Sequence, residues 1–519
     1  MRLLLPVSPM TARTLTLRGD TYPLVLPTLR DPRLHVAAVI ITIHVLGQVT
    51  LGFRVSVPQI LAAIVTCAVI EVAITFRQAK AFVWPASAML TGSGVALILR
   101  LTGQPPNDPW ATDGWYVFAG VAAFSLLTKY VIKYRGSHIF NPSNVGLVVA
   151  FLVLGMTRVE PLDFWWGPLD LGLLAAYAVI LGGGLLITRR LHLLAMAAAF
   201  WLTLAAGLGL LAASGHCMTA NWAFSPVCGV DYWRVIVISP EVMIFLFFMI
   251  TDPKTIPAGN IGRLAFAILV GIASTLLMAP QTDEWWTKVA LLSGLVLVCA
   301  IRPLLDRVVP APKTAADNPR TFALAPGLTG AVLALGTVLL VGAGIVLAGT
   351  PARGPIARET TATLGGVPVR VDPSTLPPIT VSDDVISFDH ELAGPEMQAV
   401  VVTLAENLEF ENEALRRLDE SILMQVDHGD RLDEMRAMMG SGPVVLRHYL
   451  FDSIDVSLLV PFGQQTGLSL GLLGRGTVIE ELYDPVSGDV VERAEFPFEK
   501  TFAMRRATGD RWLIVGVLP

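Results

Sequence analysis

Long apolar runs alternate with short polar segments along the chain up to about residue 350. Each run has about 20 residues, which is the length a helix needs to cross the hydrocarbon core of a bilayer. The pattern therefore predicts about eleven membrane-spanning helices. The runs lie near residues 34–53, 56–75, 84–102, 115–132, 139–156, 168–187, 191–213, 234–251, 262–280, 285–305 and 325–349.

The polar segments between these runs carry positive charge unevenly. One alternate set of loops holds eighteen Lys and Arg residues and the other set holds five. Because cytoplasmic loops retain positive charge during insertion, this asymmetry predicts a cytoplasmic N-terminus. An odd number of spans then places the C-terminal region outside a multi-pass cytoplasmic (inner) membrane protein. We interpret residues 1–33 as a basic cytoplasmic arm and not as a signal peptide, because no short apolar core with a small-residue cleavage site is present.

Composition supports this picture and separates the two ends of the chain. The 519 residues are 53% hydrophobic and 15% charged, with a mean hydropathy of +0.62, which excludes an ordinary soluble protein. Up to residue 350 there are 23 Lys and Arg against 15 Asp and Glu, whereas the rest has 14 against 27. The C-terminal region is therefore predicted to be a separate, acidic, soluble unit. We expect the lipid bilayer as a partner and no nucleic acid.

That C-terminal region has its own internal pattern. Residues 350–384 are rich in Pro, Gly and Thr and predict a linker. From about 390 to 439 apolar residues recur at helical spacing, and beyond 443 alternating runs separated by turns predict strands. We therefore expect residues 385–519 to form an extracytoplasmic α+β domain. It shows no nucleophile–base pair and no cluster of metal-ligating residues.

Four cysteines divide on this map. Cys67 and Cys299 fall inside predicted spans, whereas Cys217 and Cys228 bracket "CMTANWAFSPVC" in a predicted outside loop. An oxidising compartment permits a disulfide between Cys217 and Cys228, and the alternative is two unpaired thiols. No Cys or His spacing indicates a metal site.

Two proline-marked motifs carry the candidate chemistry of the membrane region. Proline interrupts the backbone hydrogen-bond ladder, and a helix that starts beside it presents free N–H groups and a positive dipole end, which suits an anion or a carbonyl-rich ring. Both motifs fall on the predicted cytoplasmic face, so we expect them to form the walls of one site. The alternatives are an ordinary helix cap and an Asp–Lys pair in a turn. The candidate residues are Phe140, Asn141, Pro142, Ser143 and Asn144 in "FNPSN", and Thr251, Asp252, Pro253 and Lys254 in "TDPK".

A third stretch, residues 84–109, resembles the stretch 239–263. Each begins near a proline, continues through a Met-containing apolar run and ends with threonine and proline. The two stretches are five spans apart and run in opposite directions, as an inverted repeat requires. We therefore predict two inverted halves of five spans each, with the eleventh span as an anchor for the outside domain.

At these motifs the sequence resembles a known family. "SAMLTGSGVALILR", "FNPSNVGLVV" and "FFMITDPKTIP", in this order, are similar to the RnfD subunits of Rnf electron-transport complexes and the NqrB subunits of sodium-pumping NADH:quinone reductases, especially to a stand-alone branch linked to enediyne biosynthesis. The resemblance covers roughly residues 34–305. It implies a ten-helix inverted-repeat core that holds flavin and passes electrons within a membrane complex, coupled in pumping relatives to ion movement.

The cofactor expectation needs one adjustment to this sequence. Those relatives attach a flavin phosphate to the threonine of a Ser-Gly-Ala-Thr motif, but the loop after the fifth span reads "MTRVEPLDFWWGP". The expected cofactor is therefore flavin, as FMN or riboflavin, held without a covalent bond. Carried over by motif, Phe140, Asn141 and Pro142 match the first signature, and Thr251, Asp252 and Pro253 match the second.

Three functions follow as hypotheses. The first is a flavin-binding electron-transport subunit, working with other membrane or extracytoplasmic redox subunits and coupled to ion translocation in the manner of its pumping relatives. The second is a small-molecule or ion transporter, and the third is a non-catalytic scaffold that presents the outside domain. The predicted parts are a basic arm (1–33), a ten-helix core (34–305), a cytoplasmic loop and eleventh helix (306–349), a linker (350–384) and an α+β domain (385–519).

Overall fold

The computed structural model contains two compact units, which are described separately below. The membrane unit contains the apolar helices. The C-terminal unit contains the C-terminal sheet together with Gly215–Cys228 and Thr282–Glu284. The structure describes residues 13–17, 20–28, 31–102, 104, 108–162, 171–220, 223, 226–309, 363–364, 367–369, 371–440, 442–459, 469–507 and 511–518.

Seven helices of the described membrane unit are long and apolar enough to span a bilayer, which makes the chain a multi-pass membrane protein. Three shorter apolar helices, α3 (Ala86–Ile98), α4 (Trp115–Val131) and α5 (Pro142–Leu154), lie among them. The predicted runs up to residue 305 thus coincide with helices, whereas the run near 325–349 and most of the linker lie outside the described residues. The seven long helical segments are α1 (Pro32–Val49), α2 (Val57–Ala79), α6 (Leu171–Arg190), α7 (Leu194–Ala213), the run Gly229–Met249, α10 (Asn260–Met278) and α11 (Glu284–Val308).

The predicted spans 84–102 and 139–156 are too long. At 1.5 Å per residue, α3 and α5 each reach only about 20 Å, because the chain turns extended after each helix. The resulting strands, β4 (Leu99–Leu101) and β7 (Val159–Pro161), pair antiparallel. The ladder satisfies backbone groups that lipid could not, and Trp285 and Lys288 of α11 cover its end by donating to Val159 O and Leu162 O, each at 3.0 Å.

The predicted single span 234–251 is also divided. Helix α8 (Gly229–Val237) ends before Ser239, and α9 (Pro240–Ile244) begins with proline at its first position. The Ser239 hydroxyl accepts a hydrogen bond from Val242 N at 3.1 Å and caps the new helix. Helix α9 continues into η1 (Phe245–Met249), one π-helical turn, and such turns often occur at functional sites.

The two groups of helices repeat the same neighbour pairs. Helix α2 packs on α3 and α4, and α7 packs on α8 and α10. In the first group Gly146 of α5 lies against Ser125 of α4, and in the second Gly294 of α11 lies against Ser274 of α10; a Cβ at either glycine would overlap the serine. Only glycine permits this close approach at both places.

The basic arm contains more regular structure than the sequence predicts. Strands β1 (Arg13–Leu17) and β2 (Asp20–Val25) form an antiparallel hairpin. Strand β2 also pairs in parallel with β3 (Phe82–Val83), just before α3. The ring of Tyr22 contacts those of Phe76 and Phe82, so an aromatic cluster holds the hairpin to the membrane unit.

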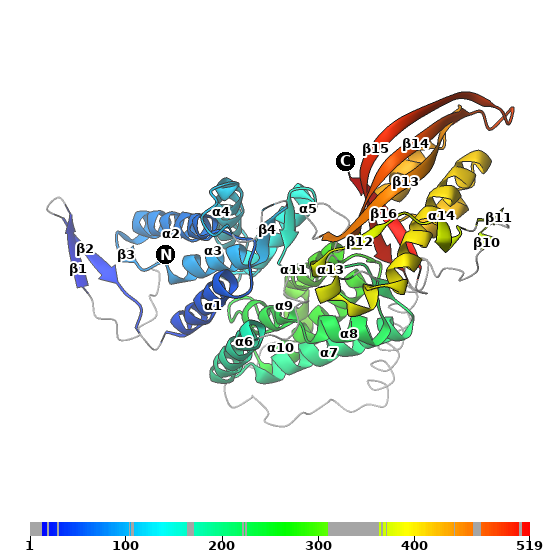
Figure 1. Cartoon of the computed structure of the whole chain (residues 1–519). Coiled ribbons are helices and arrows are strands. Elements are labelled where there is room, and N and C mark those ends of the chain that lie inside the picture. Colours follow the sequence, from blue (N-terminus) through cyan, green and yellow to red (C-terminus); the bar gives the residue numbers. More distant parts are fainter. Residues whose placement is uncertain are drawn as a thin grey trace, which may run out of the picture. The chain divides into compact units, whose positions relative to one another are not determined.

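The C-terminal unit is an α+β domain, as predicted. Its sheet has the order β12-β13-β14-β15-β16, antiparallel except for the parallel pair β12–β13. Helix α14 (Pro395–Arg417) packs against β13 and β16 and places Leu404 and Leu408 in the core (Figure 1). The other elements are β12 (Ile379–Val381), α13 (Asp383–Phe388), α15 (Glu420–Val426), α16 (Asp430–Met438), β13 (Val444–Leu459), β14 (Ser469–Tyr483), β15 (Val490–Arg506) and β16 (Trp512–Leu518).

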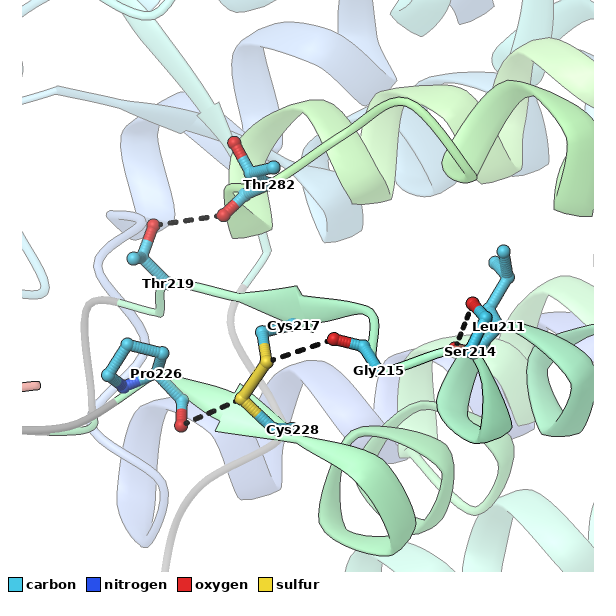
Figure 2. Close-up of a disulfide and its surroundings, with 8 residues drawn as sticks. All are labelled: Leu211, Ser214, Gly215, Cys217, Thr219, Pro226, Cys228 and Thr282. Atoms are coloured by element: carbon cyan, nitrogen blue, oxygen red, sulfur yellow. Dashed lines mark hydrogen bonds between the residues drawn. A yellow bond between two sulfur atoms is a disulfide. The ribbon is translucent and has the colours of Figure 1, made fainter. Parts of the chain in front are cut away.

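Cys217 and Cys228, the candidate pair, form a disulfide within this unit. The disulfide closes a small hairpin of β8 (Cys217–Met218) and β9 (Val227–Cys228) (Figure 2). The buried Arg505 of β15 donates to the carbonyl oxygens of Ala220 and Ala223 in the same loop. The loop between α7 and α8 is therefore held to the C-terminal sheet.

Candidate functional site

The first motif forms a capped helix start. The Asn141 side-chain oxygen accepts hydrogen bonds from Asn144 N at 3.3 Å and from the Ser143 hydroxyl at 2.9 Å, and Pro142 occupies the first position of α5. Its amide nitrogen donates to Met249 O at 3.1 Å. Asn141 thus satisfies the start of one helix and the end of another, and it joins the two motifs directly.

The second motif is a turn fixed by side chains. Asp252 accepts a hydrogen bond from Lys254 N at 3.0 Å through one carboxylate oxygen, and its other oxygen lies 3.3 Å from Nε2 of His138. Arg302 of α11 donates to the carbonyl oxygens of Lys254 and Thr255 at 3.1 and 2.8 Å. The turn is therefore held from both sides and presents Asp252 at a defined position.

The two motifs line one cavity of about 460 Å³, which we call the motif cavity. This volume falls within the range of about 300–1,000 Å³ that is typical of small-molecule and cofactor sites. Helices α1, α3 and α5 all begin at its wall, where they contribute Pro32, Ser87 and Pro142. Helix starts carry partial positive charge, so three dipoles favour an electron-rich ligand here.

The lining divides into an apolar interior and a charged mouth. Arg33 and Lys254 are exposed at the mouth, and Arg33 forms an ion pair with Asp31. Hydroxyl groups project from Ser87, Thr91, Ser143 and Thr251. The apolar lining residues are Val36, Ile40, Leu90, Leu97, Ile98, Ile187, Leu191, Ile244, Phe247, Phe248 and Met249.

Most of the predicted site residues meet at this cavity, and two do not. The lining contains Asn141, Pro142, Ser143 and the whole Thr251–Lys254 turn. Asn144 instead faces α11, where it donates to Leu292 O at 3.0 Å, and Phe140 does not line the cavity. Because Asn144 is the residue after Ser143 in α5, its side chain lies on a different face of the helix.

Sequence reasoning missed several lining residues. Ser87, Thr91 and Gly94 belong to the third proline-marked stretch, whose likeness to the second stretch was the available signal. Arg33 and His138 gave no such signal, because a basic residue at the start of a span already has a topological explanation. Their place at the cavity depends on how α1 and α5 pack.

A second, smaller cavity of about 30 Å³ adjoins the motif cavity. The two share Ile98, Ile244 and Met249. The small cavity also contacts Glu241 and Lys288, whose charged atoms are 3.8 Å apart. An apolar constriction therefore separates the motif cavity from a buried acid–amine pair.

Known membrane oxidoreductase proteins are similar in sequence to this chain. It is 26% identical to the RnfD-type subunit of the ion-translocating oxidoreductase complex of Escherichia coli, and equally to that of Shigella dysenteriae. The predicted family resemblance is confirmed. In each case the similarity covers 36% of this chain and 66% of the relative, just under two thirds of its length. No family model matches the chain.

Proposed function

We propose that this chain is an integral membrane electron-transfer subunit that holds flavin without a covalent bond in the motif cavity. The observation that carries the proposal is the meeting of both proline-marked helix breaks around one cofactor-sized cavity. Resemblance to the RnfD-type subunit of an ion-translocating oxidoreductase complex supports an electron-transfer role over simple scaffolding.

The residues present fit a flavin. A fused ring needs flat apolar walls and a few polar groups at its edge, and the cavity offers Ile244, Phe247 and Phe248 beside hydroxyl groups. Gly94 keeps the space between α3 and α5 open, because a Cβ there would come within 3.2 Å of the Ser143 hydroxyl. The donor set is thus suited to ring carbonyls and nitrogens.

Each group would have a definite part in binding. A bound flavin would supply reversible uptake of electrons. Ser143 and Thr91 would donate hydrogen bonds to the ring edge, while the apolar interior would exclude water. At the mouth, Arg33 and Lys254 would neutralise the phosphate of FMN, so we expect FMN to bind more tightly than riboflavin. Thr251 donates its hydroxyl to Phe247 O, which favours a structural role over covalent attachment.

We further propose the membrane setting. The asymmetry of eighteen against five basic residues supports a cytoplasmic membrane location with the N-terminus inside and the C-terminal domain outside. The motif cavity would then open to the cytoplasm, where an electron donor can approach it. Partner redox subunits and coupling to ion movement are part of the same proposal.

A transporter is the second candidate function. It is favoured by the two adjoining cavities, which meet at Ile98, Ile244 and Met249 next to helix breaks. Transporters place solute sites at such breaks between inverted halves. Uptake of a radiolabelled solute or ion by vesicles containing the purified chain, without any electron donor, would support this alternative.

The deciding experiment is a flavin assay. The full chain, purified in mild detergent from cofactor-replete cells, is expected to show flavin absorbance and to release the flavin into the supernatant on acid precipitation. Flavin retained in the pellet would contradict non-covalent binding. A protein with neither bound flavin nor affinity for added FMN would refute the redox function.

A further inference from the structure

A buried ion pair lies beside the motif cavity, within helices that span the membrane. Lys129 Nζ of α4 is 3.0 and 3.1 Å from the two carboxylate oxygens of Glu71 of α2. Their side chains are 12% and 13% exposed. Tyr130 donates its hydroxyl to the same carboxylate. Ionisable groups within a membrane are costly and are commonly functional.

This ion pair contacts the cavity through one hydroxyl group. Lys129 Nζ lies 3.4 Å from the Ser87 hydroxyl oxygen, and Ser87 lines the motif cavity. An ammonium group has three N–H donors, so Lys129 can bond both carboxylate oxygens and Ser87 at once. A hydroxyl that accepts a hydrogen bond still has its own proton to donate. The groups Tyr130, Glu71, Lys129 and Ser87 thus form a continuous chain of exchangeable protons.

We propose that Glu71 and Lys129 relay protons between the cytoplasmic surface and the ligand in the motif cavity, through the Ser87 hydroxyl. The inference rests on the proposed redox function, because a ring that gains electrons in an apolar cavity must gain a proton to avoid a buried negative charge. No residue of the FNPSN or TDPK motifs takes part in this relay.

The transfer balances as follows. When an electron carrier of the complex has reduced the ring, Ser87 gives its hydroxyl proton to the ring and takes one from Lys129 Nζ. Lys129 is left neutral and recovers a proton from Glu71, which in turn takes one from water at the surface. One proton moves inward, and each protein group returns to its starting state. On oxidation of the ring the same proton leaves by the reverse route.

Other charged groups face this pair or the cavity. Arg33 acts on Glu71, Lys254 acts on Lys129, and His138 and Asp252 lie at the cavity wall. A guanidinium does not release its proton in proteins, and Lys254 lies at the exposed mouth. The pair could also serve only to clamp α2 to α4. The test must therefore separate proton transfer from charge and from packing.

The substitution Lys129→Arg makes this separation. Arginine keeps the positive charge and the ion pair with Glu71 but cannot pass on a proton. Ser87→Ala keeps the ion pair and breaks its link to the cavity. Lys80→Met is the matched control, since Lys80 is an exposed lysine at the end of α2 whose amine lies over the ring of Phe76.

The readout is proton release from pre-reduced, FMN-loaded full-length protein mixed anaerobically with ferricyanide, which accepts electrons without protons. A pH dye follows the protons, and absorbance follows the flavin. In the wild type and in Lys80→Met, proton release should keep pace with flavin oxidation. In Lys129→Arg and Ser87→Ala it should be at least about tenfold slower, with FMN content unchanged, which corresponds to about 1.4 kcal/mol in the barrier.

The outcomes are distinct. Wild-type proton release in Lys129→Arg would refute the relay and leave a structural clamp, while the flavin function stood. A chain that binds no FMN would refute the proposed function and this inference with it. Should Lys129→Arg fold poorly, Ser87→Ala gives the same decision, because it leaves both charges in place.

Discussion

Asn141 donates a hydrogen bond to Met249 O at 3.1 Å, across 108 positions of sequence. The same side chain caps α5, and Met249 ends the π-helical turn η1. A single amide therefore fixes the distance between the two walls of the motif cavity. This contact makes the cavity sensitive to the identity of one buried residue.

We expect Asn141→Ala to reduce both stability and flavin content. Loss of a helix cap costs about 1 kcal/mol, and the unpaired Met249 carbonyl adds about 1–3 kcal/mol. Thermal unfolding in detergent and the ratio of flavin to protein measure the two effects. Ser239→Ala is the matched control, because Ser239 also caps a helix but does not line the motif cavity. Flavin content as high in Asn141→Ala as in the control would exclude Asn141 from the site.

Asp252→Asn tests the charge at the cavity. Asparagine can still accept the hydrogen bond from Lys254 N, so the turn should persist while one negative charge disappears. We expect the affinity for FMN relative to riboflavin to rise about threefold to tenfold, because the phosphate then meets less repulsion. Fluorescence titration with both flavins measures the ratio. Asp306→Asn, which removes a carboxylate that does not line the cavity, should leave it unchanged.

The disulfide should protect the loop that Arg505 holds. Closing a loop of this size stabilises a fold by about 3 kcal/mol in the chain-entropy account. Replacing Cys217 and Cys228 with serine should therefore make the loop more susceptible to proteolysis and lower the unfolding temperature. In the wild type, maleimide labelling in mild detergent should need prior reduction, since Cys67 and Cys299 are buried. Rapid labelling of unreduced protein would show that the disulfide does not form.

The C-terminal domain should respond to pH through His448. A hydrogen bond from His448 to Glu409 raises the pKa of the histidine, with a smaller opposing effect of burial. For Glu409, burial opposes ionisation, but His448, Asn412 and Arg416 outweigh it and lower the pKa.

The sign follows from these two directions. A raised histidine pKa gives stability that is complete below about pH 6.5 and is lost as pH rises through the folded-state pKa. A lowered glutamate pKa gives stability that is lost as pH falls through its folded-state value. Limited proteolysis of the full chain between pH 4 and 9 should show this maximum, and His448→Gln should flatten its alkaline side.

A buried ion pair in the same domain allows a double-mutant test. Arg431 holds both carboxylate oxygens of Glu411, and the two side chains are 4% and 5% exposed. Breaking such a pair costs about 3–5 kcal/mol, whereas replacing both partners by apolar residues is often nearly neutral. Arg431→Met should therefore destabilise the domain strongly, and Glu411→Met combined with it should recover most of the loss. Equal loss in the single and double variants would contradict this account.

Much of this arrangement follows from residue order alone. Helix positions follow from apolar length, because a bilayer imposes about 20 residues on each span. Helix starts at Pro32, Pro142 and Pro240 follow from proline with a capping residue before it. The α+β character of residues 385–519 follows from the change of period, and the family follows from three short motifs.

Tertiary structure decided where helices stop and which side chains share the cavity. Apolar residues continue through Leu99 and Leu101, so no local signal ends α3 there; the strand exists because β7 pairs with it. Gly94, Arg33 and His138 reach the motif cavity only through packing of α1, α3 and α5. Glu71 and Lys129 lie on different helices, and their contact with Ser87 arises from three packed helices, a relationship that no spacing along one chain can encode.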